Sequence, residues 1–206
     1  MSKVILAVGA HPDDIEIGVG GTLKKFKGHG EKLYSIIMTR GENGNHCPEM
    51  SEAEASASML GLEDLVFLDF KDTFIPYNGK SVQKLEEYIK KINPSIIYTH
   101  TSHDRHQDHQ NTSKIIQSAS RFIPNVFLFD SPSTSNEFAP NYFEDITQTI
   151  DQKIEMLGKY HSQVEKGIVD LDLIKAQARV WGRKNRQINE EVNFAEAFEV
   201  YRTFVM

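Results

Sequence analysis

A histidine and two adjacent aspartates follow directly after the first apolar segment of the chain. The motif is His11-Pro12-Asp13-Asp14, and the apolar run before it is Val4–Val8. Carboxylates packed this closely repel one another unless a cation or a proton lies between them. Imidazole and carboxylate groups are also ordinary ligands of divalent metal ions. We therefore expect a metal site at the end of a buried strand.

A second group of polar side chains lies far along the chain. Four of the eight histidines fall within the eleven residues from Thr99 to His109, which follow the apolar run Ile96–Thr99. Ligands of a parallel sheet bind beyond the carboxyl ends of its strands, so we expect this segment to face the first motif across one crevice. His106 and His109 share one face if a helix starts here. One of them could bind the metal while the other contacts a substrate on that metal.

The neighbouring residues of this segment suggest supporting roles. Asp104 and Asp108 could orient the two histidine rings from outside the set of metal ligands. We interpret His100 and His103 as structural, since a lone histidine near a strand end usually is. Two histidines and one carboxylate leave coordination positions open, as catalytic sites do. Zn²⁺ fits this set best, and Fe²⁺ or another divalent ion would be accepted. The remaining aspartate is placed to take a proton from metal-bound water.

Three glycines after the first motif, Gly18, Gly20 and Gly21, invite comparison with a phosphate-binding loop. The dinucleotide fingerprint places its glycines straight after the strand, where the pyrophosphate meets bare backbone amides. Here the two aspartates occupy that position and would repel a pyrophosphate. The sequence therefore disfavours a nucleotide cofactor, and we expect the glycines to let the chain turn tightly into a helix.

Strands and helices alternate along the first part of the chain. Apolar runs without polar alternation predict buried strands, and a 3.6-residue spacing with capping residues predicts helices. The expected strands are Val4–Val8, Leu33–Thr39, Leu65–Leu68, Ser95–Thr99 and Val126–Phe129. The expected helices run from Gly20 to near Gly28 or Gly30, from an N-cap at Ser51 to Gly61, over Val82–Ile92 and over Gln110–Phe122. This alternation predicts an α/β fold with right-handed crossovers and a mostly parallel sheet covered on both faces.

The pattern changes after Asp130. Tyr142–Ile146 could be one more strand, Thr147–Tyr160 and Leu171–Gln187 are typical of helices, and Phe194–Val200 fits a helix or a strand. No repeat or linker interrupts the chain. We therefore expect a single domain over residues 1–206 with an elaborated C-terminal part.

The composition excludes several classes of protein. The chain is 39% hydrophobic and 25% charged, as soluble globular proteins are. No apolar stretch approaches the roughly 18 residues of a membrane span. The first residues lead directly into an apolar strand, so we expect no signal peptide. A single cysteine, Cys47, excludes an intrachain disulfide and favours the cytoplasm. The net charge is −6, and we interpret the basic residues from Arg179 to Arg186 as a solvated face, so nucleic acid is not expected as a partner.

The two polar motifs together resemble those of the PIG-L/LmbE family of zinc-dependent N-deacetylases. The pattern A-H-P-D-D-x-E-x-G-x-G-G-T-L spans Ala10 to Leu23, and H-x-D-H spans His106 to His109. The similarity extends to about residue 130. Further segments that resemble the family are Thr39-Arg40-Gly41-Glu42, Glu52 and, more weakly, His161-Ser162-Gln163 and Ala195-Glu196-Ala197-Phe198.

This resemblance implies a Rossmann-like three-layer fold and zinc-dependent removal of an acyl group, usually acetyl, from an amino sugar. The family's metal ligands match His11, Asp14 and His109, and its general base matches Asp13. Its oxyanion-stabilising histidine matches His106, and the residue that orients this histidine matches Asp108. One position departs from the family pattern, because Glu49 stands where an arginine is frequent. The loop Gly44–Met50, with His46 and Cys47, also looks individual.

We therefore expect an amidohydrolase that removes an N-acetyl group from an amino sugar or a sugar conjugate resembling N-acetylglucosamine. Zinc-activated water would attack the amide, with Asp13 as base and His106 stabilising the oxyanion. Two alternatives remain: a sugar-binding protein that holds a metal without chemistry, and a metal-dependent hydrolase of another bond. Asp13 argues against the first, since a structural site needs no spare carboxylate. Phosphate esters, as an example of the second, more often call for two metals and basic clamps. The resemblance also suggests a homo-oligomer.

Overall fold

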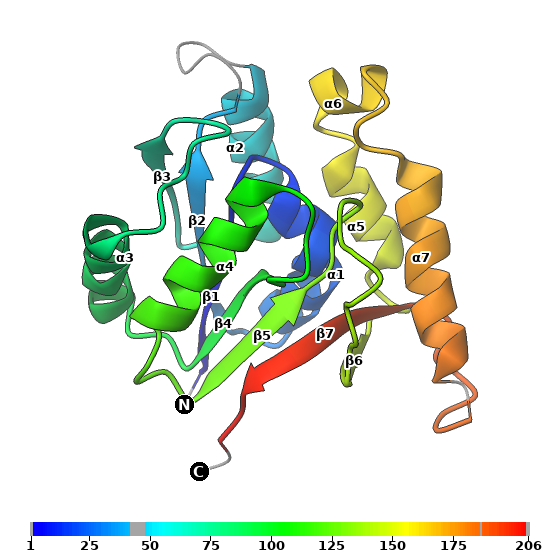
Figure 1. Cartoon of the computed structure of the whole chain (residues 1–206). Helices are drawn as coiled ribbons and strands as arrows, with labels where there is room; N and C mark the ends of the chain where they lie inside the picture. Colours follow the sequence, from blue (N-terminus) through cyan, green and yellow to red (C-terminus); the bar gives the residue numbers. More distant parts are fainter. Residues whose placement is uncertain (1, 42–47, 186, 205–206) are drawn as a thin grey trace.

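One mixed β-sheet runs through the molecule with the strand order β3-β2-β1-β4-β5-β7-β6 (Figure 1). The computed structural model describes residues 2–41, 48–185 and 187–204. The strands are β1 (Val4–Gly9), β2 (Lys32–Thr39), β3 (Asp64–Phe70), β4 (Ile96–His100), β5 (Asn125–Phe129), β6 (Tyr142–Asp145) and β7 (Ala195–Arg202). Strands β1 to β5 pair in parallel, and β7 is antiparallel to both β5 and β6. The mostly parallel sheet predicted from the sequence is confirmed.

Helices cover both faces of this sheet, which gives the three layers expected of a Rossmann-like fold (Figure 1). They are α1 (Asp14–Gly28), α2 (Pro48–Leu60), α3 (Gly79–Ile92), α4 (Gln107–Ala119), α5 (Ile150–Leu157), α6 (His161–Glu165) and α7 (Leu171–Lys184). Helices α3 and α4 pack together on one face, and α1 packs against α5 on the other. No helix in the described part of the chain is long and apolar enough to cross a membrane.

Strand β1 is apolar throughout because both of its faces are buried. Ile5 and Ala7 point into the core beneath α1 and α5, whereas Leu6 and Val8 point into the core beneath α3 and α4. All four side chains are fully buried. Because successive residues of a strand face opposite sides, a strand covered on both sides cannot alternate with polar residues. Burial of each large aliphatic side chain contributes about 1.5–3 kcal/mol.

Helix α1 begins well before Gly20, the residue at which the sequence pattern predicted its start. The glycines therefore lie within the helix, and the prediction that they form the turn into it was wrong. A Cβ atom at Gly18 would overlap the ring of Phe129, and one at Gly21 would come within 2.9 Å of Ile146. These glycines allow α1 to pack closely against β5 and against the segment that precedes α5.

Other helix boundaries also differ from the sequence prediction, and one assignment that the sequence left open is a strand. Helix α2 starts at Pro48, a residue favoured at the first helical position, so Ser51 lies inside the first turn and is not the N-cap. The long helix expected over Thr147–Tyr160 is the shorter α5, followed by a separate short α6. Residues 194–200, for which helix and strand were both open, belong largely to strand β7, which pairs with β5 and brings the C-terminal part into the sheet.

Candidate metal and catalytic centre

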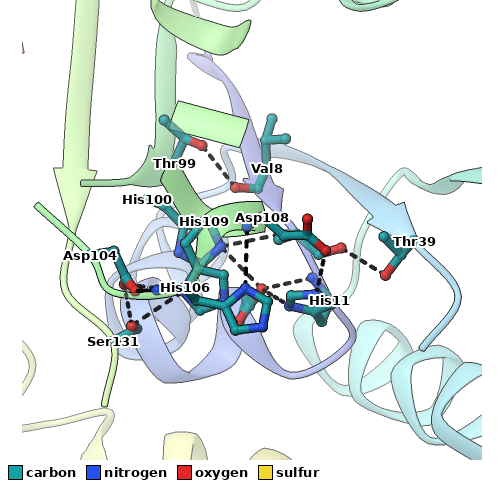
Figure 2. Close-up of polar contacts among 12 residues, drawn as sticks. Val8, His11, Thr39, Thr99, His100, Asp104, His106, Asp108, His109 and Ser131 are labelled. Carbon is teal, nitrogen blue, oxygen red and sulfur yellow. Dashed lines mark hydrogen bonds and ion pairs between the residues drawn. The ribbon is translucent and has the colours of Figure 1, made fainter. Parts of the chain in front are cut away.

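The two polar motifs meet at the carboxyl ends of β1 and β4 (Figure 2). His11 lies in the turn after β1, and Asp14 is the first residue of α1. His106 is the N-cap of α4, and His109 lies in the first turn of that helix. The rings of His11 and His109 have centroids 5.3 Å apart. Residues nearly a hundred positions apart in the chain thus come together as the sequence pattern predicted.

Asp14 lies between the two histidines at distances that suit a shared metal ion. One carboxylate oxygen is 3.4 Å from His11 Nδ1, and the other is 3.4 Å from His109 Nε2. Ligand atoms bound to a tetrahedral zinc ion at about 2.0–2.2 Å stand about 3.4 Å from one another. Two imidazole nitrogens and a carboxylate are also a ligand set that binds zinc in catalytic sites with an open coordination position. His109 belongs to two groups whose ligand atoms lie within 4.8 Å of one another, one with His11 and His106 and one with Asp14 and His100. The side chains around His109 therefore suit a divalent ion.

The charges of this group are those of a site prepared for a cation. Burial opposes ionisation of Asp14, but His109, His100 and His11 outweigh it and hold the pKa of Asp14 well below its ordinary value. Burial likewise opposes protonation of His11. Its contacts with three carboxylates prevail, and the pKa of His11 lies well above its ordinary value. A metal ion would replace the proton on His11 as the positive charge among these carboxylates.

Asp13 adopts a backbone conformation that L residues rarely take. Its φ is 93°, in the left-handed region, although it is neither glycine nor asparagine. The residue is buried and stands at the N-cap of α1, yet its carboxylate makes no capping hydrogen bond. Left-handed conformations of such residues cost about 1–3 kcal/mol and are concentrated at functional sites. The geometry thus keeps this side chain out of the ordinary capping role.

Asp104 holds the ring of His109 from outside the group of three. Its Oδ2 lies 3.1 Å from His109 Nδ1, and it accepts hydrogen bonds from the Ser131 and Ser133 hydroxyls, each at 2.6 Å. Burial alone would raise the pKa of Asp104, but His109 and the two serines reverse this and lower it strongly. Asp104 therefore orients a histidine ring, as its place in the sequence suggested.

Asp108 makes contacts different from those implied by the family resemblance. Its carboxylate accepts the backbone N–H groups of Thr73 (2.7 Å) and Ile75 (3.0 Å) and lies 3.2 Å from His11 Nε2. The implied partner was His106, which instead receives the backbone N–H of Asp108 at its Nδ1 (3.2 Å). Asp108 therefore joins the loop after β3 to the ring of His11.

His106 stacks on His109, with ring centroids 4.7 Å apart, and meets His11 edge to face at 4.8 Å. Burial, followed by the charges of His109 and His11, lowers the pKa of His106. A neutral ring that accepts a hydrogen bond at Nδ1 carries its proton on Nε2. His106 can therefore donate a hydrogen bond from Nε2 without a positive charge of its own.

The other two histidines of the second motif have different positions. His100 is fully buried, with Nε2 3.0 Å from Asp14 Oδ2 and 3.1 Å from the backbone nitrogen of Ala10. Burial lowers the pKa of His100 to about 4, so this ring is a neutral support behind Asp14. His103 points away, toward Glu137, with 3.5 Å between Nδ1 and Oε2.

Sequence reasoning missed one residue of the site. Asp72, in the loop after β3, has its Oδ1 3.2 Å from His11 Nε2. The hydrogen bond with His11 lowers the pKa of Asp72. His11, Asp72 and Asp108 form a further group whose ligand atoms lie within 4.8 Å of one another. A carboxylate just beyond a strand end was the available signal, but no spacing motif linked it to the histidines.

Two segments singled out by the family resemblance contact each other. The carboxylate of Glu52 in α2 accepts the backbone N–H (2.9 Å) and the hydroxyl (2.6 Å) of Ser162 at the start of α6. Glu42, His46 and Cys47 lie outside the described residues. Glu49 is in the first turn of α2.

The fold and the group at the strand ends define an α/β protein with a site suited to a divalent metal ion. Residues 6–120, more than half of the 206, match the family described as PIG-L: GlcNAc-PI de-N-acetylase. The chain belongs to this family.

Relatives of the chain include named deacetylases. An uncharacterized deacetylase of Escherichia coli, YaiS, is 34% identical over 169 residues, which cover 78% of this chain and 91% of the relative. The diacetylchitobiose deacetylase of Thermococcus kodakarensis is 28% identical over 195 residues, which cover 82% of this chain and 73% of the relative.

Solved structures share the fold over almost the whole chain. The conserved protein TT1542 of Thermus thermophilus has a TM-score of 0.84 at 27% identity and matches 99% of this chain and 97% of its own. GalB of Pseudomonas putida, a 4-carboxy-2-hydroxymuconate hydratase, has a TM-score of 0.83 at 20% identity, with 99% and 98% covered. The fold alone therefore does not determine the reaction.

Proposed function

We propose that the protein is a zinc-dependent deacetylase that removes the N-acetyl group from an amino sugar or a conjugate of the N-acetylglucosamine type. The observation that carries this proposal is the arrangement around Asp14. Two histidines and this carboxylate suit one metal ion, and Asp13 adjoins them as a buried carboxylate that makes no capping bond. The family and the names of the relatives support the substrate class.

In the proposed reaction, His11, Asp14 and His109 hold the ion, which when bound would polarise the amide carbonyl and acidify a water molecule. Asp13 takes a proton from the attacking water as the new C–O bond forms. His106 donates a hydrogen bond from Nε2 to the oxygen that gains negative charge. The C–N bond then breaks, a proton passes from Asp13 to the leaving amine, and acetate and the free amino sugar are released.

The decisive experiment measures acetate release from a panel of N-acetylglucosamine derivatives, including glycan- and nucleotide-linked ones. The protein is loaded in parallel with Zn²⁺ and Fe²⁺, and bound metal is measured for each sample. We expect release by the wild type, a loss of at least about a hundredfold in Asp13→Ala with metal retained, and loss of the metal in His109→Ala. Asp151→Ala, at an exposed carboxylate of α5, serves as the matched control.

Three results would contradict parts of this proposal. No acetate from any substrate, with one metal ion bound per chain, would exclude the activity on these sugars and favour a binding role. Near-normal activity of Asp13→Ala would exclude Asp13 as the base. Two metal ions per chain, together with cleavage of a phosphate ester, would favour a hydrolase of another bond.

A further inference from the structure

A cavity of about 630 Å³ lies between the segment that follows β5 and helices α5 and α7. These elements lie together on one side of the sheet (Figure 1). The volume is in the range of about 300–1,000 Å³ that small-molecule sites have. None of the six residues of the proposed metal and catalytic centre lines it. Ser131 lines this cavity and also donates to Asp104, so it forms the wall between the two sites.

One buried polar group of the lining lacks a well-formed hydrogen bond. The indole nitrogen of Trp181 is buried and makes no well-formed hydrogen bond among the described residues, although it lies close to the carboxylate of Asp130. Burial raises the pKa of Asp130 to about 6, although the Lys153 ammonium and the Trp181 N–H act in the opposite direction. Buried donors are almost always satisfied, by protein, water or ligand. A group in the cavity that accepts from the indole N–H would satisfy this donor and would lie beside the Asp130 carboxylate.

The other charged groups of the lining are already engaged with the protein. Lys153 donates to Glu196 Oε1 (2.5 Å) and to the carbonyl of Ile17 (2.6 Å). Glu196 also accepts the backbone N–H groups of Gly21 and Thr22. This buried ion pair links β7 to α1 and α5 and has a structural role. Asp170 Oδ1 accepts the backbone N–H of Leu173. Among the charged groups of the described lining residues, Asp130 is thus the one left to contact a ligand, and the Trp181 N–H lies beside it.

The chemistry of this pair favours a hydroxyl group. A hydroxyl accepts a hydrogen bond from the indole N–H and donates one to the carboxylate at the same time. An ammonium cannot accept from the indole, and an anion would be repelled by Asp130. The apolar side chains of Ile168, Leu173 and Ile174 suit the C–H surface of a sugar ring.

We propose that this cavity is a second carbohydrate site, which binds a neutral saccharide ring with one hydroxyl between Trp181 and Asp130. The amides of Asn136 and Gln177 on the cavity wall supply partners for further hydroxyls. Binding here requires neither a metal ion nor Asp13. The inference is therefore independent of the proposed deacetylation.

Trp181 is the only tryptophan of the chain, so its fluorescence reports on this cavity alone. The test titrates the full-length protein with glucose and N-acetylglucosamine, and with glucosamine and acetate as charged probes. We expect a saturable change in emission with the neutral sugars, with equal affinity in metal-loaded and metal-stripped protein. Asp130→Ala should weaken binding about tenfold or more, because it removes a hydrogen bond to a charged group.

A second variant keeps the test decisive if Asp130→Ala does not fold. Gln177 is exposed, and Gln177→Ala should weaken binding about two- to tenfold. Asp151→Ala, outside the cavity, should bind as the wild type does. The inference would be overturned if no neutral sugar changed the emission saturably, which would indicate a water-filled cavity. It would also be overturned if Asp130→Ala bound the neutral sugars as tightly as the wild type, or if glucosamine or acetate bound more tightly than the neutral sugars. Sugar binding that depends on the metal and Asp13 would overturn it too.

Discussion

Asp104 Oδ2 lies 3.1 Å from Nδ1 of His109, and this contact determines which nitrogen of the ring faces Asp14. Two serine hydroxyls hold the carboxylate of Asp104 in place. With Nδ1 engaged, Nε2 of His109 points at Asp14 Oδ1, 3.4 Å away. The ring is therefore oriented for a metal ion before any ion binds.

Asp104→Ala should therefore weaken metal binding although it removes no ligand. Loss of a carboxylate that orients a metal-binding histidine lowers affinity by about ten- to a hundredfold. Competition with a chromogenic chelator measures this, and His109→Ala sets the limit of complete loss. Asp151→Ala provides the control, and circular dichroism checks that each variant is folded. Wild-type affinity in Asp104→Ala would show that the ring needs no such support.

The parts of the site that could be predicted are those encoded by local patterns. His11, Asp14, His106 and His109 each follow a recognisable strand, and the rule that strand ends share one edge brings them together. Strand β1 was predictable because burial on both faces leaves an uninterrupted apolar run. These features need no knowledge of distant packing.

The parts that could not be predicted depend on tertiary contacts. Asp72 approaches His11 only because the amides of Thr73 and Ile75 bind Asp108, more than thirty residues away. Gly18 looked like part of a turn, since nothing near it in sequence reveals the ring of Phe129 against which it packs. The contacts of Asp108 differ from the implied ones for the same reason.

The left-handed conformation of Asp13 predicts a conflict between stability and function. Glycine adopts φ of 93° without strain, whereas alanine does not. Asp13→Gly should therefore be more stable than Asp13→Ala by about 1 kcal/mol, measured by urea unfolding, and both should be inactive under the proposed function. Asn93→Gly and Asn93→Ala form a matched pair of variants distant from the site, because Asn93 is the C-cap of α3 with φ of 51°. Equal stabilities of the two Asp13 variants would show that this conformation stores no strain.

Glu16 predicts a pH dependence of stability in the metal-free protein. Its carboxyl group is buried in α1 beside Ser56 Oγ, and burial raises its pKa from 4.5 to about 7. A raised folded-state pKa contributes stability that is present below pH 4.5 and lost as the pH rises through 7. Glu16→Gln has no such loss, so relative to the wild type it should gain about 2 kcal/mol between pH 5 and pH 8.

Urea unfolding of wild type and Glu16→Gln, in chelator at the two pH values, measures this difference. Glu155→Gln, at an exposed position of α5, is the control and should follow the wild type at both. Parallel pH trends for wild type and Glu16→Gln would mean that Glu16 is ionised in the folded protein throughout this range.

We expect that a single methyl group added at Gly182 is not tolerated. A Cβ atom there would lie 2.5–2.6 Å from the backbone of Asn193 and Phe194, just before β7. Because backbone atoms cannot rotate aside as a side chain can, Gly182→Ala must push α7 away from this segment. We expect a loss of about 2 kcal/mol or more, a fall in Tm of about 4–8 °C. Gly28→Ala, with nothing within 4 Å of the new atom, should leave Tm nearly unchanged or raise it slightly. Equal behaviour of the two variants would show that α7 shifts freely, and the cavity beside Trp181 would then lack a fixed shape.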